Sequence, residues 1–420
     1  MKEKIGVILS SFGLSNLMFH EYISECKERF ILMTDKLQES NVRDFSGFYK
    51  EVYYFDNFDS NALVDKLVFD LSRDFNIDRV ISIFEPDILR ASYIRQALEI
   101  EGDRPSNIEL FRDKVLMKEI ASNGGCSVPA FKKIKMPTDF LSFIKSHSYP
   151  VFVKPISSCG SVGASAIRNE HDACNFLSEI SGVSKFDTFN TDFQVEDFID
   201  GKFHHVDGLV VNSEIVAKRI GKYSSNADLE SINAKGYWST TSLDKNDKRY
   251  TLINDFIQML TLEFSKRKSS FFFHCEVFLK NDVVYLCEIA CRAPGGGMAL
   301  AWEYAFGASP FELCLELELQ GHIDQSKLEI IRNNAQKEKL VSSICLLPLT
   351  GKFISSPKDC ELDSVVHYKT NLLEGNYYYG GKYSGDTDCV MILEGSESDV
   401  LDKSVFEALS WYRANSIWEN

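Results

Sequence analysis

The first hundred residues alternate between short apolar runs and amphipathic stretches. The apolar runs, which are typical of buried strands, are "KIGVILS" (4–10), "RFILMT" (29–34), "EVYYFD" (51–56) and "RVISIF" (79–84). The stretches with helical spacing are "NLMFHEYISEC" (16–26), "NALVDKLVFDLSRDF" (61–75) and "EPDILRASYIRQALEI" (85–100). Strands that alternate with helices favour an open parallel sheet. We therefore predict an N-terminal α/β domain over residues 1–105.

The pattern changes in "EGDRPSNIELFRDKVLMKEIASNGGCSVPAF" (101–131). Either Ser106 or Asn107 can cap a helix that carries "RDK" (112–114). Gly124–Gly125 is a natural stop for this helix. The sequence therefore predicts one continuous helix between these signals.

A loop of small residues follows a lysine in "VFVKPISSCGSVGASAIRN" (151–169). An extended pattern resumes at Ala164, so the loop joins two strands. A phosphate-binding P-loop and a dinucleotide fingerprint both need a helix behind the loop, and both are therefore excluded. One interpretation is a flexible hairpin whose amides fold over phosphates, with Gly160 and Gly163 allowing close approach and Lys154 supplying charge. The other is a plain turn.

Two further strands appear in "FQVEDFIDGKFHHVDGLVV" (193–211), joined by a turn at Asp200–Gly201. Carboxylates at the end of the first strand lie next to Phe198 and Ile199. This arrangement could grip a planar base and a ribose. A solvated connector is the alternative.

The stretch "FFFHCEVFLKNDVVYLCEIACRAPGGGM" (271–298) contains two strands joined by a turn at Asn281–Asp282. Glu276 and Glu288 lie among apolar residues, where carboxylates are costly unless they are paired or bind a cation. A three-residue loop, 281–283, would place the two glutamates opposite each other, on one face with Phe272, His274, Leu286 and Ala290. Mg²⁺ is the hard cation that commonly carries ATP phosphates. A two-residue turn would put the pair out of register and weaken this hypothesis.

Arg292 follows the second glutamate and precedes Pro294 and three glycines. An arginine beside a glycine-rich turn suits a bidentate contact with phosphate or carboxylate. A hairpin with edge charges is the alternative for the whole stretch.

The composition limits which binding partners and which cellular compartment we expect for the chain. The net charge of -15 argues against a nucleic-acid-binding surface. We expect no membrane partner, because no apolar run approaches the roughly 20 residues that span a bilayer. The chain opens without the pattern of a signal peptide, and its 11 cysteines contain no C-x-x-C pair. These features predict reduced thiols and a cytoplasmic location.

These motifs together resemble the ATP-grasp carboxylate–amine ligases. "RDK", "VFVKP" with its loop, "VEDFIDG", "CEVFL" and "YLCEIACR" occur in the order and with the spacing of that family. The resemblance covers about residues 1–420, because "ICLLPLTGKFISS" (344–356) and the segment after "YYYGG" are similar to its C-terminal lobe. Within the family, "EIACRAPGGGM" is closest to the L-amino acid (dipeptide) ligase branch. The biotin carboxylase pattern has asparagine where this chain has Ala290.

The resemblance implies an α/β protein with the ATP-grasp fold in three parts. Residues 1–105 would form the N-terminal open parallel α/β (pre-ATP-grasp) domain. Residues 106–335 would form the ATP-grasp domain, with a lid at about 123–195. Residues 336–420 would form a C-terminal α+β lobe that completes the ATP-grasp core.

The resemblance also implies ATP and Mg²⁺ as cofactors and a role for each matching residue. Glu276 and Glu288 would hold the metal, and Arg292 and Lys154 would be catalytic. Phosphates, adenine and ribose would contact, in chain order, Lys114, Lys154, Ser157, Ser158, Gly160, Ser161, Gly163, Glu196, Asp197, Phe198, Ile199, His205 and Asp207. The substrate would contact Arg292, Gly295 and Gly296. A separate hypothesis comes from the polar, turn-rich segment 222–242, because long irregular segments are often binding loops. This segment would line an amino-acid pocket, with Tyr237 and Trp238 near the substrate side chain, and a mobile surface loop is the alternative.

The implied function is an ATP-dependent ligase. It would activate a carboxylate as an acyl phosphate and couple it to an amine, joining amino acids into a dipeptide or amide and releasing ADP and phosphate. A ligase for another acid and amine, in nucleotide or natural-product biosynthesis, is one alternative. A non-catalytic ATP-binding subunit is another. The expected partners are small-molecule carboxylates and amines, and a homodimer is common in the family.

Overall fold

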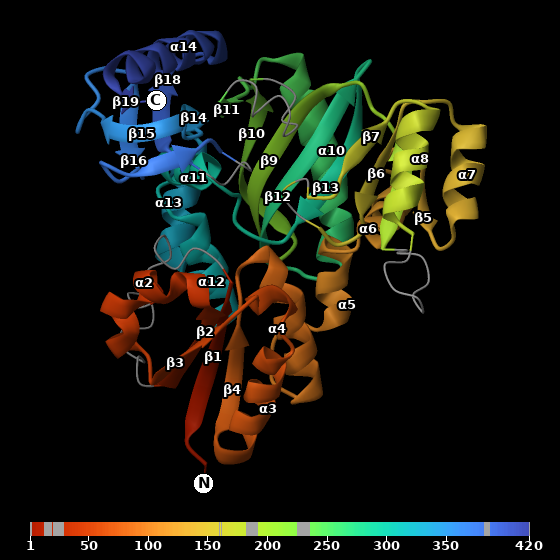
Figure 1. The fold of residues 1–420 in the computed structure, drawn as a ribbon, viewed down its shortest axis with the longest axis vertical. Helices are drawn as coiled ribbons and strands as arrows, with labels where there is room; N and C mark the ends of the chain where they lie inside the picture. The colour runs from red at the N-terminus through yellow and green to blue at the C-terminus, as the bar shows by residue number, and fades with distance from the viewer. Residues whose placement is uncertain are drawn as a thin grey trace.

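The computed structural model describes residues 2–11, 19, 29–158, 160, 162–181, 192–224, 236–381 and 387–419. These residues form four sheets, which Figure 1 shows as separate layers joined by helices. The mixed α/β architecture agrees with the fold class predicted from the sequence. The predicted helix at 16–26 lies outside the described residues, apart from Phe19.

The N-terminal sheet is parallel and has the strand order β3-β2-β1-β4. Its strands are β1 (Lys4–Ser10), β2 (Phe30–Asp35), β3 (Glu51–Phe55) and β4 (Asn76–Ile81), and its helices include α2 (Glu39–Val42), α3 (Leu63–Asp74) and α4 (Glu85–Ala97). Buried aliphatic residues of β1, β2 and α3, such as Val7, Ile31 and Val68, form the core on one side. The prediction of an open parallel sheet is confirmed.

The helical region after this sheet is divided in two. Helix α5 (Pro105–Ile108) is followed by a 3₁₀ turn and then by α6 (Lys114–Asn123). The cap of α6 is Asp113, whose side chain accepts hydrogen bonds from the amides of Val115 and Leu116 at 2.8 and 3.0 Å. The prediction of one helix capped at Ser106 or Asn107 was therefore wrong, because a closer carboxylate caps the helix that bears Lys114.

A second sheet, which we call the lid sheet, is antiparallel with the order β5-β8-β6-β7. Its elements are β5 (Phe131–Ile134), α7 (Pro137–Ser146), β6 (Val151–Pro155), β7 (Ser165–Ile167), α8 (Glu170–Glu179) and β8 (Phe193–Asp197). Phe140 of α7 and Phe176 of α8 pack edge to face in its core, with ring centroids 5.0 Å apart. The loop between β6 and β7 joins two paired strands, as the sequence predicted.

The central sheet has eight strands in the order β13-β12-β9-β10-β11-β14-β18-β16, and every pair of adjacent strands in it is antiparallel. The strands are β9 (Lys202–Val211), β10 (Glu214–Tyr223), β11 (Tyr237–Ser242), β12 (Phe271–Lys280), β13 (Val283–Ala290), β14 (Leu340–Leu346), β16 (Val365–Thr370) and β18 (Cys389–Gly395). Helix α10 (Lys248–Ser265) packs on one face. Because β11 pairs with β14, the C-terminal strands extend this same sheet.

The remaining helices are α11 (Gly297–Phe306), α12 (Pro310–Gln320), α13 (Gln325–Ala335) and α14 (Ser398–Asn415). The fourth sheet, β17-β15-β19, consists of β15 (Thr350–Ser355), β17 (Tyr377–Tyr379) and β19 (Ile417–Glu419). Figure 1 shows α12 and α13 between the N-terminal sheet and the C-terminal strands. The buried Trp302 of α11 packs against Phe272 of β12, so α11 lies on the face of the central sheet opposite α10.

The β12–β13 hairpin differs from its prediction in one informative way. Its turn has two residues, Asn281 and Asp282, both with positive φ (51° and 62°), and Lys280 pairs with Val283. A regular ladder would then place Glu276 opposite the wrong residue. A β-bulge at Cys287 shifts the register by one, so Glu276 lies opposite Glu288 after all. Between the turn and the bulge, the register set by the two-residue turn pairs Leu286 with Val277 in the core under α10, so the prediction that Leu286 lies on the face of the glutamates was wrong.

Candidate active site

The opposed glutamates of β12 and β13 mark one face of the central sheet. The side chains of Glu276 and Glu288 are 19% and 20% exposed, so both can be reached by a ligand. Lys114 Nζ lies 3.3 Å from Glu288 Oε2, and Tyr223 donates a hydrogen bond of 2.8 Å to Glu276 Oε1. Burial would raise the pKa of Glu288, but Lys114, Lys154 and Arg292 lower it to about 2. Glu288 is therefore a carboxylate at neutral pH.

Two lysines enclose the carboxylate of Glu196, which lies on β8 of the lid sheet. Lys154 Nζ is 2.9 Å from Glu196 Oε1, and Lys118 Nζ is 3.0 Å from Oε2. Gln194 donates a further hydrogen bond of 2.9 Å to Oε2. Lys154 and Glu196 are diagonal neighbours on β6 and β8, and Lys118 lies one helical turn after Lys114 on α6.

The two lysines differ in how firmly they hold their protons. Burial lowers the pKa of Lys118 to about 8, although Glu196 acts in the opposite direction. Burial also opposes the charge of Lys154, but Glu196 and Glu288 raise its pKa above the ordinary value. Lys154 is therefore the more permanent positive charge, and it lies between the lid sheet and the glutamate pair.

A third glutamate, Glu85, connects the N-terminal sheet to this site. It begins α4 and is only 6% exposed. Arg112 forms an ion pair with its Oε1, and Arg292 Nε lies 2.5 Å from its Oε2. Burial would raise the pKa of the Glu85 carboxyl, but Arg292 and Arg112 hold it below the ordinary value. Arg292 is thus fixed in place by a carboxylate from another part of the chain.

The loop after β6 is attached to the start of α6. The Lys114 amide donates to the Ile156 carbonyl at 3.1 Å, and Lys114 Nζ donates to the Ser158 carbonyl at 2.5 Å. Arg112 donates to the Ser157 carbonyl at 3.1 Å. Beyond these contacts Ser157 and Gly160 are exposed.

Gly163 closes this loop, and no other residue would fit there easily. Its φ is +72°, and a Cβ would lie 2.9 Å from Pro155 Cγ. Gly160 also has a positive φ, +61°. Ser161 lies outside the described residues.

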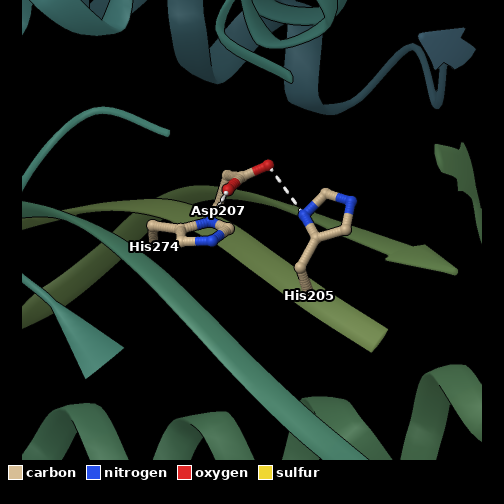
Figure 2. Close-up of side chains that lie close together, drawn as sticks. All are labelled: His205, Asp207 and His274. Carbon is tan, nitrogen blue, oxygen red and sulfur yellow. Dashed lines mark hydrogen bonds and ion pairs between the residues drawn. The ribbon is translucent and has the colours of Figure 1, made fainter. Parts of the chain in front are cut away.

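Asp207 lies at the centre of a buried polar group on the same face of the sheet. Its Oδ1 accepts a hydrogen bond of 2.8 Å from His274 Nδ1, and its Oδ2 is 3.0 Å from His205 Nδ1. Figure 2 shows the carboxylate between the two imidazole rings. Arg219 NH1 lies 3.6 Å from Oδ2. Burial disfavours a charged imidazole, but the hydrogen bond to Asp207 and the nearby Glu276 carboxylate raise the pKa of His274 to about 9.

Several residues expected to contact the adenine base and the ribose are buried or already paired with other residues. The Glu196 carboxylate is occupied by lysines, and the Asp197 amide donates to the Ala130 carbonyl at 2.9 Å. Phe198 is 37% exposed at the end of β8. His205 and Asp207 are both fully buried, so the structure gives neither a surface for a ribose. We therefore interpret Glu196 as a residue that orients Lys118 and Lys154, and not as a contact of the base.

The expected substrate residues fall into two groups. Trp238 packs with Met298 beside the glycine turn, where a Cβ on Gly296 would lie 2.7 Å from the indole. Met298 in turn meets Tyr223, the hydrogen-bond donor to Glu276. Tyr237 contributes to a different core under α14, where Arg413 lies 5.6 Å from its ring centroid. The structure therefore brings Trp238 and Gly296, but not Tyr237, toward the glutamates.

The remaining predictions for this region are only partly described. Gly295 has no atom within 4 Å of an added Cβ, so the turn is open there. Ile199 accepts a hydrogen bond from the Gly201 amide at 3.0 Å. Most of the proposed pocket segment 222–242, namely residues 225–235, lies outside the described residues.

Two charged residues of the site, Glu85 and Lys118, were missed from the sequence, and His274 was expected on the face of the glutamates but without a role. Lys118 had a signal, because it lies four residues after Lys114 and such residues share a helix face. His274 precedes Glu276 by two residues on a strand, which also places both on one face. Glu85 had no local signal, since its partners Arg112 and Arg292 are distant in sequence.

Comparisons with known proteins identify the fold. No family model matches the sequence. An L-arginine-specific L-amino acid ligase of Bacillus subtilis is 22% identical over 276 residues, a match that spans 66% of this chain and 66% of that protein, just under two thirds. The crystal structure of an L-amino acid ligase from Bacillus licheniformis superposes with a TM-score of 0.73 at 15% identity and covers 100% of both chains. The chain has the ATP-grasp fold of the carboxylate–amine ligases.

Other ATP-grasp structures extend this likeness. The biotin carboxylase domain of a Hydrogenobacter thermophilus 2-oxoglutarate carboxylase, solved as a dimer with MgADP, ADP and bicarbonate, gives a TM-score of 0.69 at 13% identity. The match covers 100% of this chain and 91% of that one. Among the described helices of this ATP-grasp chain, none has the length and apolar character needed to cross a membrane.

Proposed function

We propose that this ATP-grasp protein is an ATP-dependent carboxylate–amine ligase that joins amino acids into a dipeptide or amide. One observation carries the proposal: Glu276 and Glu288 face each other on a sheet whose adjoining elements direct Lys114, Lys154 and Arg292 to the same place. The similarity to L-amino acid ligases supports amino acids as substrates. The other acid and amine classes remain the alternative for the substrate.

The residues present fit a divalent cation with ATP. Glu276 and Glu288 offer hard oxygen ligands that are partly exposed, and an ammonium already lies 3.3 Å from Glu288. When bound, Mg²⁺ would neutralise phosphate charge at these two carboxylates. We assign Lys154 and Lys114 to the ATP phosphates and the 157–163 loop to their cover. Arg292 would stabilise charge on the transferred phosphoryl group or hold a substrate carboxylate.

The reaction that this layout serves has two steps. A substrate carboxylate oxygen attacks the γ-phosphorus of ATP, ADP leaves, and an acyl phosphate remains. The substrate amine then attacks the acyl carbon, phosphate leaves, and the amine gives up a proton as the amide forms. The residues of the chain bind, orient and exclude water, because little covalent work is asked of them.

The test is product formation from pairs of amino acids. The chain would be supplied with ATP, MgCl₂ and amino acids singly and in pairs, with ADP release and product mass measured together. We expect ADP release that needs both an acid and an amine, with a product whose mass is their sum less one water. ATP binding without stimulated release would instead support a non-catalytic ATP-binding subunit.

Matched variants tie the activity to this site. Glu276→Gln and Glu288→Gln should each lose ligation, because the pair loses one metal-binding carboxylate. Glu316→Gln is the control, since Glu316 is a buried glutamate that pairs with Lys327 outside the site. Equal losses in all three variants would contradict the assignment of the metal pair.

A cytoplasmic location and a homodimer are part of the proposal. The nine cysteines of the described residues are free thiols, which suits a reducing compartment. The biotin carboxylase domain named above was solved as a dimer, and light scattering on this protein would test whether it also forms one.

A further inference from the structure

The buried polar group around Asp207 has two possible roles. The first is a metal centre of its own, because within the described residues His205, Asp207 and His274 bring ligand atoms within 4.8 Å of one another. The second is a support for the neighbouring Glu276. The distances and charges decide between them.

The geometry of the group argues against an ion inside it. Ligand atoms bound to one tetrahedral zinc at about 2.0 Å lie about 3.3 Å apart. Here the contacts from Asp207 to His274 and His205 are 2.8 and 3.0 Å, which leave no space for an ion between them. Arg219 adds a positive charge 3.6 Å from Asp207 and contacts His205 Nε2 at 3.5 Å. The Arg219 guanidinium therefore already neutralises the Asp207 carboxylate, which a metal ion would need as a ligand.

The same group does reach Glu276. His274 and Glu276 lie two residues apart on β12 and project from the same face. His274 Nδ1 donates a hydrogen bond to Asp207 Oδ1, and its Nε2 lies 3.7 Å from Glu276 Oε1. Tyr223 donates to that same oxygen from another strand, at 2.8 Å. Glu276 Oε1 therefore accepts a hydrogen bond from Tyr223 and has the His274 imidazole as an ion-pair neighbour on another side.

Asp207 is itself anchored at the far end. Arg219 donates hydrogen bonds of 3.1 Å from Nε to Ser242 and from NH2 to Thr240, both on β11. The result is a continuous row across four neighbouring strands, from β11 through β10 and β9 to β12. Because these side chains are almost completely buried, the row has little freedom to move.

We propose that Asp207 and His274 are positioning residues that hold Glu276 in the orientation in which it binds the divalent cation. The inference rests on the proposed function, because that function makes Glu276 a metal ligand. It assigns a role to two residues that the site itself leaves unused. Ligand-supporting partners of this kind commonly change metal affinity by about 10- to 100-fold.

The test measures metal binding directly and does not depend on ligation. Mn²⁺ would replace Mg²⁺, with adenylyl imidodiphosphate present, and bound Mn²⁺ would be counted by electron paramagnetic resonance. We expect Asp207→Asn to weaken Mn²⁺ binding about 10- to 100-fold. Asp388→Asn is the matched control, because Asp388 is also buried and accepts hydrogen bonds of 2.8 Å, from Tyr412. It should leave Mn²⁺ affinity unchanged.

A second pair of variants separates positioning from mere packing. The amide nitrogen of Gln can take the place of His Nε2, whereas that of Asn can take the place of Nδ1. His274→Gln should therefore keep a donor toward Glu276 and retain more Mn²⁺ affinity than His274→Asn. If Asp207→Asn does not fold, the comparison of the two His274 variants still tests the positioning role.

The outcomes are distinct. Mn²⁺ affinity of Asp207→Asn within twofold of wild type, or equal affinities of the two His274 variants, would overturn the inference while leaving the ligase proposal intact. If the wild-type protein binds Mn²⁺ without nucleotide and Asp207→Asn abolishes that binding, the inference would be overturned in favour of a separate metal centre. A wild-type protein that binds no Mn²⁺ with nucleotide would overturn both proposals.

Discussion

Two buried glutamates flank the proposed site, and the cations around them differ. Glu85 lies between Arg112 and Arg292, whereas Glu196 lies between Lys118 and Lys154. A guanidinium keeps its charge at every accessible pH, while a buried ammonium can lose its proton. The group at Glu85 is therefore fixed in charge, and the group at Glu196 can respond to pH.

The two glutamates also come from different parts of the fold. Glu85 begins a helix of the N-terminal sheet, and Glu196 lies on a strand of the lid sheet. Each connects its own part to the pair Glu276 and Glu288. Glu85 of the N-terminal region thus takes part in the proposed site by fixing Arg292, and Glu196 of the lid sheet by holding Lys154.

The largest effect should come from removing one cation on each side. Lys154→Met and Arg292→Met should each lower kcat by about 10²–10³-fold, because each would stabilise charge on the moving phosphoryl group. Initial rates of ADP release with saturating amino acids would measure this. Lys327→Met, which removes a lysine paired with Glu312 and Glu316 away from the site, is the control. A Lys154→Met enzyme with wild-type kcat would exclude Lys154 from the phosphates.

Removing the two glutamates should separate their roles. Glu85→Gln and Glu196→Gln should each cost about 3–5 kcal/mol of unfolding free energy, because each leaves two buried cations without their carboxylate. Urea denaturation would measure this cost. Kinetically, Glu85→Gln should mainly lower kcat by loosening Arg292, and Glu196→Gln should mainly raise KM for ATP by loosening Lys154. Identical kinetic changes would show that the two sides do not differ in role.

The pH response should belong to the lysine side alone. The pKa of Lys118 in the native state, about 8, lies below its ordinary value of 10.5. The unfolded chain therefore holds this proton more firmly, so wild type gains stability relative to Lys118→Met as pH rises from about 8 to 10.5. The gain should approach about 3 kcal/mol. Denaturation of both proteins at pH 7.5 and 10 would measure it.

The arginine side supplies the control for this pH effect. The stability difference between wild type and Arg112→Met should be constant over the same pH range, because arginine stays protonated. A constant difference for Lys118→Met as well would mean that Lys118 keeps its proton and that the two sides respond alike.

The smallest effect should come from a change that keeps the charge. Arg112→Lys retains one contact of the two that Arg112 makes, with Glu85 and with the Ser157 carbonyl. We expect a loss of about 1–2 kcal/mol and faster proteolysis in the 157–163 loop. Arg90→Lys is the control, since Arg90 of α4 binds the carbonyls of Phe58 and Asp59 in the 3₁₀ turn after β3, away from the site. Loop cleavage that is no faster than in this control would show that Arg112 does not hold the loop.

The sequence predicted the parts of the fold that local patterns encode. The runs at 4–10, 29–34, 51–56 and 79–84 became the parallel strands, because buried strands need continuous apolar sequence. Two local predictions failed for local reasons. Asp113 displaced Ser106 and Asn107 as a cap, and the bulge at Cys287 changed a register that turn length alone could not give.

The site was predictable only where its residues stand in recognisable motifs. Glu276 and Glu288 were predicted because they interrupt apolar strands, which is unusual. Glu85 and Lys118 were missed because their partners lie far away in sequence or belong to another sheet. The burial of Asp207 and His205 was also hidden, since strand alternation gives the face of a residue but not its depth.

The bulge at Cys287 has a consequence beyond register. A bulged residue is left out of the regular ladder, so its carbonyl is released to other donors. The Cys287 carbonyl lies 3.4 Å from Lys118 Nζ and accepts its hydrogen bond. Deleting Cys287 would leave the two glutamates opposed, but it would remove a main-chain oxygen that accepts a hydrogen bond from the fully buried ammonium of Lys118. An irregularity in the strand thus makes the hairpin that carries Glu276 and Glu288 a structural partner of Lys118.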